Sequence, residues 1–227
     1  MTKIAFIDNS VDHDFYNPVI HWKPFIKEFV IYRAINNEFP SFNENFTHII
    51  LSGSEYSILE KADWISKEIE FIKKAIDKGI PVLGSCFGHQ LIVVALCGYK
   101  NARRRKNPEL GWIEIKIHNK NSIFRDIDDK VYAFSSHFDE VFNLPPQFKI
   151  LASSEECKIQ AFQYEDNPIW GIQFHPEINI EQGKELLYKA KFRHVEYTHI
   201  YQRALNSLPR DSKITQKIVS NFLNYIN

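Results

Sequence analysis

The feature that most constrains the fold is an apolar run that leads into a glycine-flanked cysteine and then into a second apolar run. Residues 81–90 read PVLGSCFGHQ, in which Gly84 and Gly88 lie two positions on either side of Cys86. A turn sharp enough to project one side chain between a strand and a helix strains the backbone of that residue, and small neighbours relieve the crowding. The pattern predicts Cys86 as a nucleophile at the exit of a buried strand.

The position of Cys86 also predicts its chemistry. A helix N-terminus favours the thiolate, which is the reactive form. The backbone N–H of Phe87 then faces the place where an oxyanion develops. We expect Gly53 to supply a second donor, because its Ser-Gly-Ser loop follows another apolar run and emerges at the same edge of a parallel sheet. The alternative is that Cys86 is a buried apolar side chain between two ordinary turn glycines.

A histidine and a carboxylate follow a later strand-like run. Residues 169–177 read IWGIQFHPE. Pro176 biases His175 away from helix, and in an extended chain residues two apart face the same side, so Glu177 can fix the tautomer of His175. The alternative is a chance His-Pro-Glu turn. Together with the cysteine turn, the segment predicts a Cys86, His175 and Glu177 triad.

Hydrophobic periodicity predicts a doubly wound α/β fold. Short β-branched runs bounded by turn residues are typical of buried parallel strands. In residues 62–78, isoleucines spaced four, three and four residues apart are typical of one face of a helix. Strand-crossover-strand units arranged in this way form a parallel sheet. We assign strands to residues 4–7, 48–51 and 80–83, and helices to residues 62–78 and 88–97.

The second half of the chain has a different pattern. Strand-like pieces joined by Asn-, Asp- and Pro-containing turns predict antiparallel strands, and the tail returns to helix. The last helix carries an apolar stripe that ends at Ile226. We assign strands to residues 112–117, 130–135, 160–164 and 169–174, and helices to residues 181–192 and 213–226.

Composition limits the class of protein. A chain of 227 residues with 44% hydrophobic content suits one domain, and no internal repeat or Gly/Ser linker divides it. We expect a core at residues 3–192 and a C-terminal helical extension at residues 193–227. Three scattered cysteines favour a reducing compartment, and the N-terminal segment lacks a long apolar stretch. We therefore expect a cytoplasmic protein.

Net charge and sequence motifs give no sign that the chain binds nucleic acid, a membrane surface, a metal ion or a nucleotide through a P-loop. Basic and acidic residues are equal at 28 each, so we expect neither nucleic acid nor a membrane surface as a partner. The remaining histidines lack a metal-ligand spacing, and no P-loop motif is present. We expect no metal and no cofactor.

The two motifs together resemble class I glutamine amidotransferases. GSCFGHQ matches the GxCxGxQ signature and GIQFHPE the closing HPE signature, and the whole resembles the stand-alone GMP synthase-like members. The resemblance implies a three-layer, flavodoxin-like mixed sheet in a single domain. It also implies hydrolysis of L-glutamine through a cysteinyl thioester.

The resemblance assigns further residues. It implies that Cys86 attacks the carboxamide, His175 protonates departing ammonia and Glu177 orients His175. It places Gly53 in the oxyanion loop with Phe87 and implies that the substrate is bound by Gln90, Ser136 and His137. Many relatives have Gly-Gly-Pro in the oxyanion loop, where this chain has Ser-Gly-Ser-Glu at residues 52–55.

Three functions follow from these observations. The first is a glutaminase that passes ammonia to a separate ATP-dependent synthetase, because no synthetase domain remains in the chain. The second is a γ-glutamyl hydrolase that acts on a γ-glutamyl conjugate, since the same three residues cleave any suitable γ-glutamyl amide. The third is a binding or regulatory module that the altered oxyanion loop has silenced.

Overall fold

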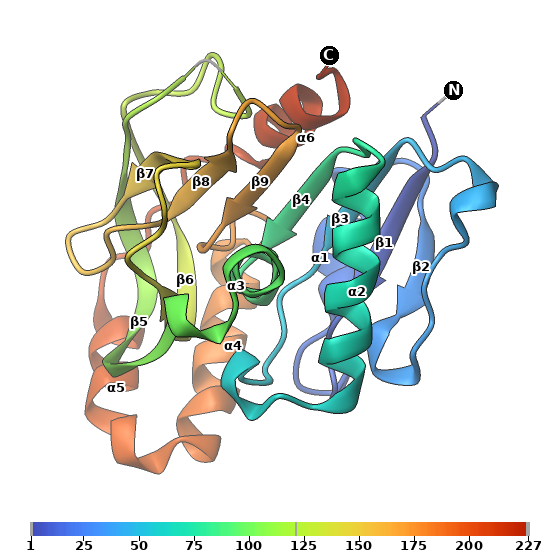
Figure 1. Ribbon diagram of the computed structural model, residues 1–227. Helices are drawn as coiled ribbons and strands as arrows, with labels where there is room; N and C mark the ends of the chain where they lie inside the picture. The colour runs from blue at the N-terminus through green and yellow to red at the C-terminus, as the bar shows by residue number, and fades with distance from the viewer. Residues whose placement is uncertain (1, 121, 226–227) are drawn as a thin grey trace.

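A mixed β-sheet organises the molecule in the computed structural model, which describes residues 2–120 and 122–225 (Figure 1). The strands are β1 (Ile4–Asp8), β2 (Val30–Arg33), β3 (His48–Leu51), β4 (Val82–Ser85), β5 (Ala102–Ile117), β6 (Lys130–Val141), β7 (Phe148–Ser153), β8 (Ala161–Tyr164) and β9 (Ile169–Ile172). The helices are α1 (Pro18–Trp22), α2 (Asp63–Asp77), α3 (Phe87–Cys97), α4 (Ile180–Arg193), α5 (Thr198–Asn206) and α6 (Thr215–Leu223). Among the described residues, the strand order is β2-β1-β3-β4-β9-β8-β7-β5-β6.

One half of the sheet is parallel and the other antiparallel. Strands β2, β1, β3, β4 and β9 run parallel, as expected for strands buried on both faces. Strands β8, β7, β5 and β6 continue the sheet in antiparallel pairs. The doubly wound α/β prediction is confirmed. One detail was wrong: β9, expected among antiparallel strands, is antiparallel to β8 but parallel to β4.

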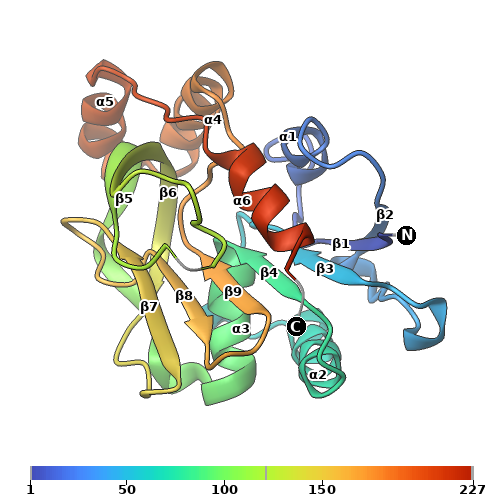
Figure 2. The same cartoon turned by 90° about the horizontal axis from the view of Figure 1, so that it is seen from above.

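Helices cover both faces of the parallel half (Figure 2). Successive strand residues point to opposite faces, so Ala5 and Ile7 pack with α2 and α3, whereas Ile4 and Phe6 pack with α1 and α6. The result is the three-layer arrangement that the family resemblance implies. The apolar stripe of α6 is buried against the sheet through Ile214, Ile218 and Phe222, while Ile226 lies outside the described residues.

The antiparallel half is closed by α4 and α5. Strand β5 pairs with β6 over most of its length, with a register shift between Arg104 and Glu109. A third apolar cluster joins Phe134 of β6 to Leu187 of α4 and Tyr201 of α5. No helix within residues 2–120 and 122–225 is both long and apolar enough for a membrane crossing.

Several elements differ from the sequence assignment. Strand β4 begins and ends two residues later than expected, and β5 and β6 extend well beyond residues 112–117 and 130–135. The sequence assignment omitted α1, β2, β7 and α5. These four elements are short, which leaves few residues in which to recognise a period, and β2 in addition has no fully buried residue.

His89 is a buried titratable group in α3. Its ring lies 4.8 Å from that of Phe162, and the residue is fully buried. Burial disfavours the cation and lowers the pKa of His89 to about 3 from an ordinary value of 6.5. The folded protein therefore holds a neutral imidazole where the unfolded chain takes up a proton.

We predict a loss of stability on mild acidification. Because the folded pKa is depressed, the folded state is favoured above pH 6.5, and stability falls as the pH drops from 6.5 towards 3. When the pH is lowered from 7 to 5, the protonation of His89 in the unfolded chain should reduce the free energy of unfolding by about 2 kcal/mol. Chemical denaturation at both pH values should show that His89→Leu reduces this difference; an unchanged difference in the variant would contradict it.

Candidate active site

The turn between β4 and α3 has the strand-to-helix form that the sequence predicts. Cys86 has φ 49° and ψ −99°, a conformation that non-glycine residues rarely adopt. A Cβ on Gly84 would lie 2.4 Å from the carbonyl oxygen of Gly88, and one on Gly88 would lie 2.5 Å from that of Leu51. Both glycines are thus required by close backbone contacts, and they let Cys86 project from the turn.

His175 and Glu177 lie just beyond the end of β9. The backbone N–H of His175 donates to the carbonyl of Phe134 at 2.8 Å, which fixes the exit of the chain from the sheet. Nδ1 of His175 donates to Oε1 of Glu177, also at 2.8 Å. Both residues are buried, so a carboxylate holds the imidazole in one tautomer and one orientation.

The parallel pairing of β4 with β9 brings the two segments together. Ser85 is in register with Ile172, and the N–H of Cys86 donates to the Ile172 carbonyl at 2.8 Å. The His175 imidazole and the Cys86 side chain lie side by side next to Gly53. Burial alone would lower the pKa of His175, but the charges of Glu177 and Cys86 raise it to about 10. The imidazole is therefore protonated at neutral pH and can serve as an acid.

Gly53 approaches the same point from the loop after β3. A Cβ at this residue would lie 2.8 Å from Cε1 of His175, 3.0 Å from the hydroxyl of Tyr16 and 3.5 Å from Cβ of Cys86. Phe87 is the first residue of α3, where a backbone N–H has no acceptor within the helix. The loop at Gly53 and the N-terminus of α3 thus flank the cysteine.

Two adjoining pockets open beside these residues. The first, which we call the cysteine-side pocket, has a volume of about 160 Å³ and is lined by Cys86, Gln90, Arg104, Ser136, Asp139 and Tyr201, among others. The second, the histidine-side pocket, has a volume of about 60 Å³ and is lined by residues that include Tyr16, Phe134 and His175. Ser54 and Glu55 line both.

A larger cavity lies apart from this cleft. It has a volume of about 800 Å³, lies between β5 and α5, and contains none of the three residues of the triad. Within the described residues, no group of three His, Cys, Asp or Glu side chains is placed to hold a metal ion.

The sequence matches a known family over most of its length. Residues 24–195 match the family described as glutamine amidotransferase class-I. The chain belongs to this family. A glutamine-hydrolyzing GMP synthase subunit from Sulfolobus acidocaldarius is 37% identical over 144 residues, which are 63% of this chain and 74% of that protein. The protein of the same name from Pyrococcus furiosus is 43% identical over 109 residues, 48% of this chain and 57% of that one.

A solved structure agrees with the fold. A glutamine amidotransferase from Thermotoga maritima superposes with a TM-score of 0.79 at 21% identity and covers 99% of both chains. At this level of identity the likeness establishes the fold alone. The fold shared with that structure takes in the C-terminal helices as well as the sheet.

The residues that the family implies for substrate binding lie at the cysteine-side pocket. Gln90 lines the pocket, and its amide nitrogen donates to the Asp139 carbonyl at 2.9 Å. Ser136 lines both pockets. His137 also lines the pocket, but its ring is occupied elsewhere: Nε2 lies 2.9 Å from a carboxylate oxygen of Glu109 and Nδ1 lies 2.9 Å from the Asp139 carbonyl.

Three residues that the sequence analysis did not single out border the triad. The amide nitrogen of Gln173 lies 3.5 Å from Sγ of Cys86. The Tyr16 ring meets that of His175 edge-on at 6.0 Å, and Glu55 lines the pocket that contains Cys86 as well as the one that contains His175. Of the three, only Gln173 could have been noticed in the sequence, because it is a polar residue within the apolar segment that ends β9.

Replacing the carboxylate partner should change the titration of His175. Glu177→Gln removes a buried negative charge beside the imidazole, so we expect the pKa of His175 to fall well below 10. The ring should then lose its proton at a lower pH than in the unsubstituted protein. Following the His175 ring proton by NMR between pH 5 and 11 measures this; an unchanged midpoint would show that Glu177 does not hold the charge.

Proposed function

We propose that this chain hydrolyses L-glutamine to L-glutamate and ammonia, with Cys86, His175 and Glu177 as its catalytic residues. The main support is geometric: a cysteine on a strained turn lies beside a buried imidazole that a carboxylate orients. Membership of the class I family and relatives named as glutamine-hydrolyzing support the substrate.

The first half-reaction forms a thioester. The Cys86 thiolate attacks the carboxamide carbon of glutamine, a C–S bond forms, and the carbonyl electrons move to the oxygen. As the tetrahedral intermediate collapses, the C–N bond breaks and the Nε2 proton of His175 moves to the nitrogen, which leaves as ammonia. A protonated His175 suits this role, because the proton is already in place when it is needed.

The second half-reaction returns the site to its starting state. Water attacks the thioester carbon while the now neutral His175 takes a proton from it. Collapse of this second intermediate breaks the C–S bond and expels the Cys86 thiolate. The product carboxylic acid loses its proton to solvent as glutamate, so both Cys86 and His175 regain their original charges.

The backbone N–H groups of Gly53 and Phe87 are the proposed oxyanion donors. One lies in the loop after β3 and the other at the N-terminus of α3, and the two segments flank the cysteine. Fixed donors at this position stabilise the charge that develops on the carboxamide oxygen, and each contributes about 10²- to 10³-fold to the rate in comparable sites. Gln90 and Ser136 are proposed to hold the rest of the glutamine, and His137, whose ring nitrogens are both hydrogen-bonded within the chain, is proposed to border it as part of the pocket wall.

We further propose that the ammonia passes to a separate ATP-dependent synthetase. Support comes from the names of the relatives, which describe each of them as one subunit of a glutamine-hydrolyzing GMP synthase. The three free cysteines suit a cytoplasmic, reducing compartment. A transfer assay tests the partnership: synthetase from the same cell should aminate its acceptor with glutamine only when this chain is present, and with ammonium salts in its absence.

Removing the thiol should abolish hydrolysis. Cys86→Ala has no nucleophile, so the rate of glutamate release should fall by at least about 10³-fold. Cys97→Ala, which removes a thiol outside the cleft, is the matched control and should retain the rate. The measurement is glutamate release from glutamine; turnover by Cys86→Ala would rule out the mechanism.

Two further measurements separate this function from its rivals. Rates on glutamine and on a panel of γ-glutamyl conjugates distinguish a glutaminase from a γ-glutamyl hydrolase, which would favour a conjugate. Stoichiometric labelling of Cys86 by a glutamine-like electrophile distinguishes an active thiol from a silenced module. A chain that is neither labelled nor active would support the module.

A further inference from the structure

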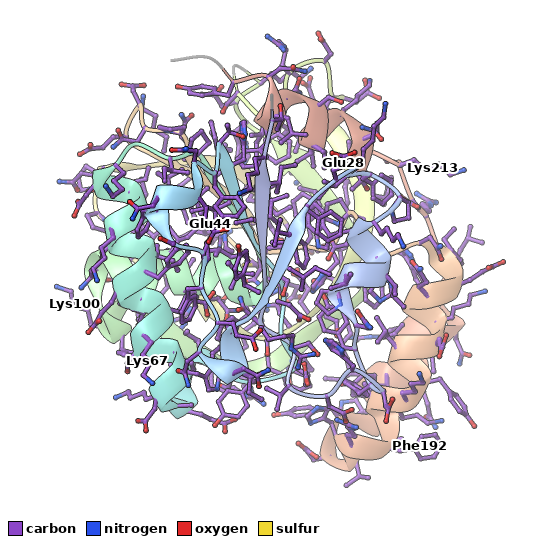
Figure 3. All side chains as sticks on the ribbon, turned by 90° about the vertical axis from the view of Figure 1, so that its right-hand side faces the viewer. Glu28, Glu44, Lys67, Lys100, Phe192 and Lys213 are labelled. Carbon is purple, nitrogen blue, oxygen red and sulfur yellow. The ribbon has the colours of Figure 1, made fainter. Side chains whose placement is uncertain are left out.

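A buried chain of amide hydrogen bonds ends at the sulfur of the nucleophile. The side chains of Gln90 and Gln173 form it, and both residues are buried. Charged side chains such as Lys100 and Lys213 lie instead at the periphery of the molecule (Figure 3). Bulk water therefore does not compete for the amide groups of the two glutamines, and neighbouring protein atoms set the direction of each.

The chain that leaves β9 turns Gln173 towards the cysteine. Residues two apart in an extended chain face the same side, so Gln173 shares the side of His175, whereas Phe174 between them packs in the core. The backbone N–H of Gln173 donates to the Gln160 carbonyl at 2.8 Å, which continues the antiparallel pairing of β9 with β8 by one residue. One short segment thus brings both an amide and an imidazole to Cys86.

The Asp139 carbonyl fixes the direction of both amides. A backbone carbonyl can only accept, so the Gln90 atom that lies 2.9 Å from it must be the nitrogen Nε2. The same Nε2 donates its second hydrogen to Oε1 of Gln173 at 3.2 Å. A reversed Gln173 amide would set two donors against each other, so its own Nε2 must be the atom that lies 3.5 Å from Sγ of Cys86.

A donor fixed in this direction suits a charged sulfur. A neutral thiol is a weak acceptor, whereas a thiolate accepts a charge-assisted hydrogen bond. Building on the proposed function, we infer that Gln173 is a catalytic residue that donates from Nε2 to the Cys86 thiolate, with Gln90 as the positioning residue that orients its amide. The chain of contacts runs from a backbone carbonyl of β6 to the attacking atom.

The strength of this hydrogen bond follows the charge on the sulfur through the reaction. The sulfur is anionic before it attacks the carboxamide and again when it leaves the second tetrahedral intermediate, and it is neutral in the thioester between these steps. The Gln173 amide therefore stabilises Cys86 both as nucleophile and as leaving group. An amide neither gains nor loses a proton at neutral pH, so proton transfer stays with His175.

Gln173→Met tests the donor, because methionine has a similar length and no N–H group. Alkylation of Cys86 by iodoacetamide, followed by mass spectrometry of its peptide, should have a midpoint about 1 pH unit higher and be about 10-fold slower on the acid side. Gln163→Met is the matched control, since this buried glutamine of β8 donates elsewhere, to the Asn167 carbonyl at 3.1 Å, and its midpoint should not move. Equal midpoints for Gln173→Met and the unsubstituted protein would overturn the inference.

The other charged and titratable groups around the sulfur are the same in both methionine variants. They are His175 and Glu177 after β9, Tyr16 after β1, Glu55 after β3, Arg104 of β5 and Asp139 of β6. A difference in midpoint between the two variants therefore reports the Gln173 amide. A change in packing alone would alter the rate without moving the midpoint.

Nuclear magnetic resonance of the unsubstituted protein provides a readout that does not depend on a variant folding. One of the two Nε2 protons of Gln173 should move downfield as the thiolate forms, with the midpoint that alkylation gives, whereas the Nε2 protons of Gln163 should not. Nε2 protons of Gln173 that do not follow the thiolate would overturn the inference while leaving glutamine hydrolysis in place. An unsubstituted protein that is alkylated at Cys86 but releases no glutamate from glutamine would instead refute the proposed function.

Discussion

The parallel pairing of β4 with β9 is the interaction on which the site depends. It joins two segments that are distant in sequence, with Gly84 opposite Gly171 and Ser85 opposite Ile172. Because both strands run in the same direction, their carboxyl ends meet at one edge of the sheet. Cys86 and His175 then leave the sheet side by side. Antiparallel pairing would have placed them at opposite ends.

Glycines allow α3 to pack closely on this strand pair. A Cβ on Gly171 would lie 2.6 Å from Nδ1 of His89 and 2.6 Å from the ring of Phe162, so a larger residue would push α3 off the sheet. Close packing brings the first turn of α3, and the N–H groups at its start, to the end of β4. The same packing buries His89 and makes a neutral imidazole part of the core. The contacts that pack α3 on the strand pair therefore both stabilise the fold and position Cys86.

The sequence predicted elements and residues whose signals are local. Buried strands such as β3 and the amphipathic α2 follow from periodicity, and Cys86, His175 and Glu177 are recognisable because each motif is confined to a few adjacent residues. Some short elements were missed: β2 has exposed or half-buried residues throughout, and α5 has only 9 residues in which to show a helical period. Tyr16 and Glu55 reach the site only through tertiary packing. No local pattern distinguishes such residues from ordinary loop residues.

The mouth of the cysteine-side pocket is built by segments that have no part in the triad. Arg104 comes from the irregular part of β5, where it lies 3.2 Å from Asp139 of β6 and stacks on Phe138, and Tyr201 comes from α5. A mouth that presents both a cation and carboxylates suits a zwitterion, whereas a uniformly charged mouth would repel one end of it. In the proposed mechanism the triad breaks the carboxamide bond, and these outer segments form the pocket through which the molecule that carries that bond would enter.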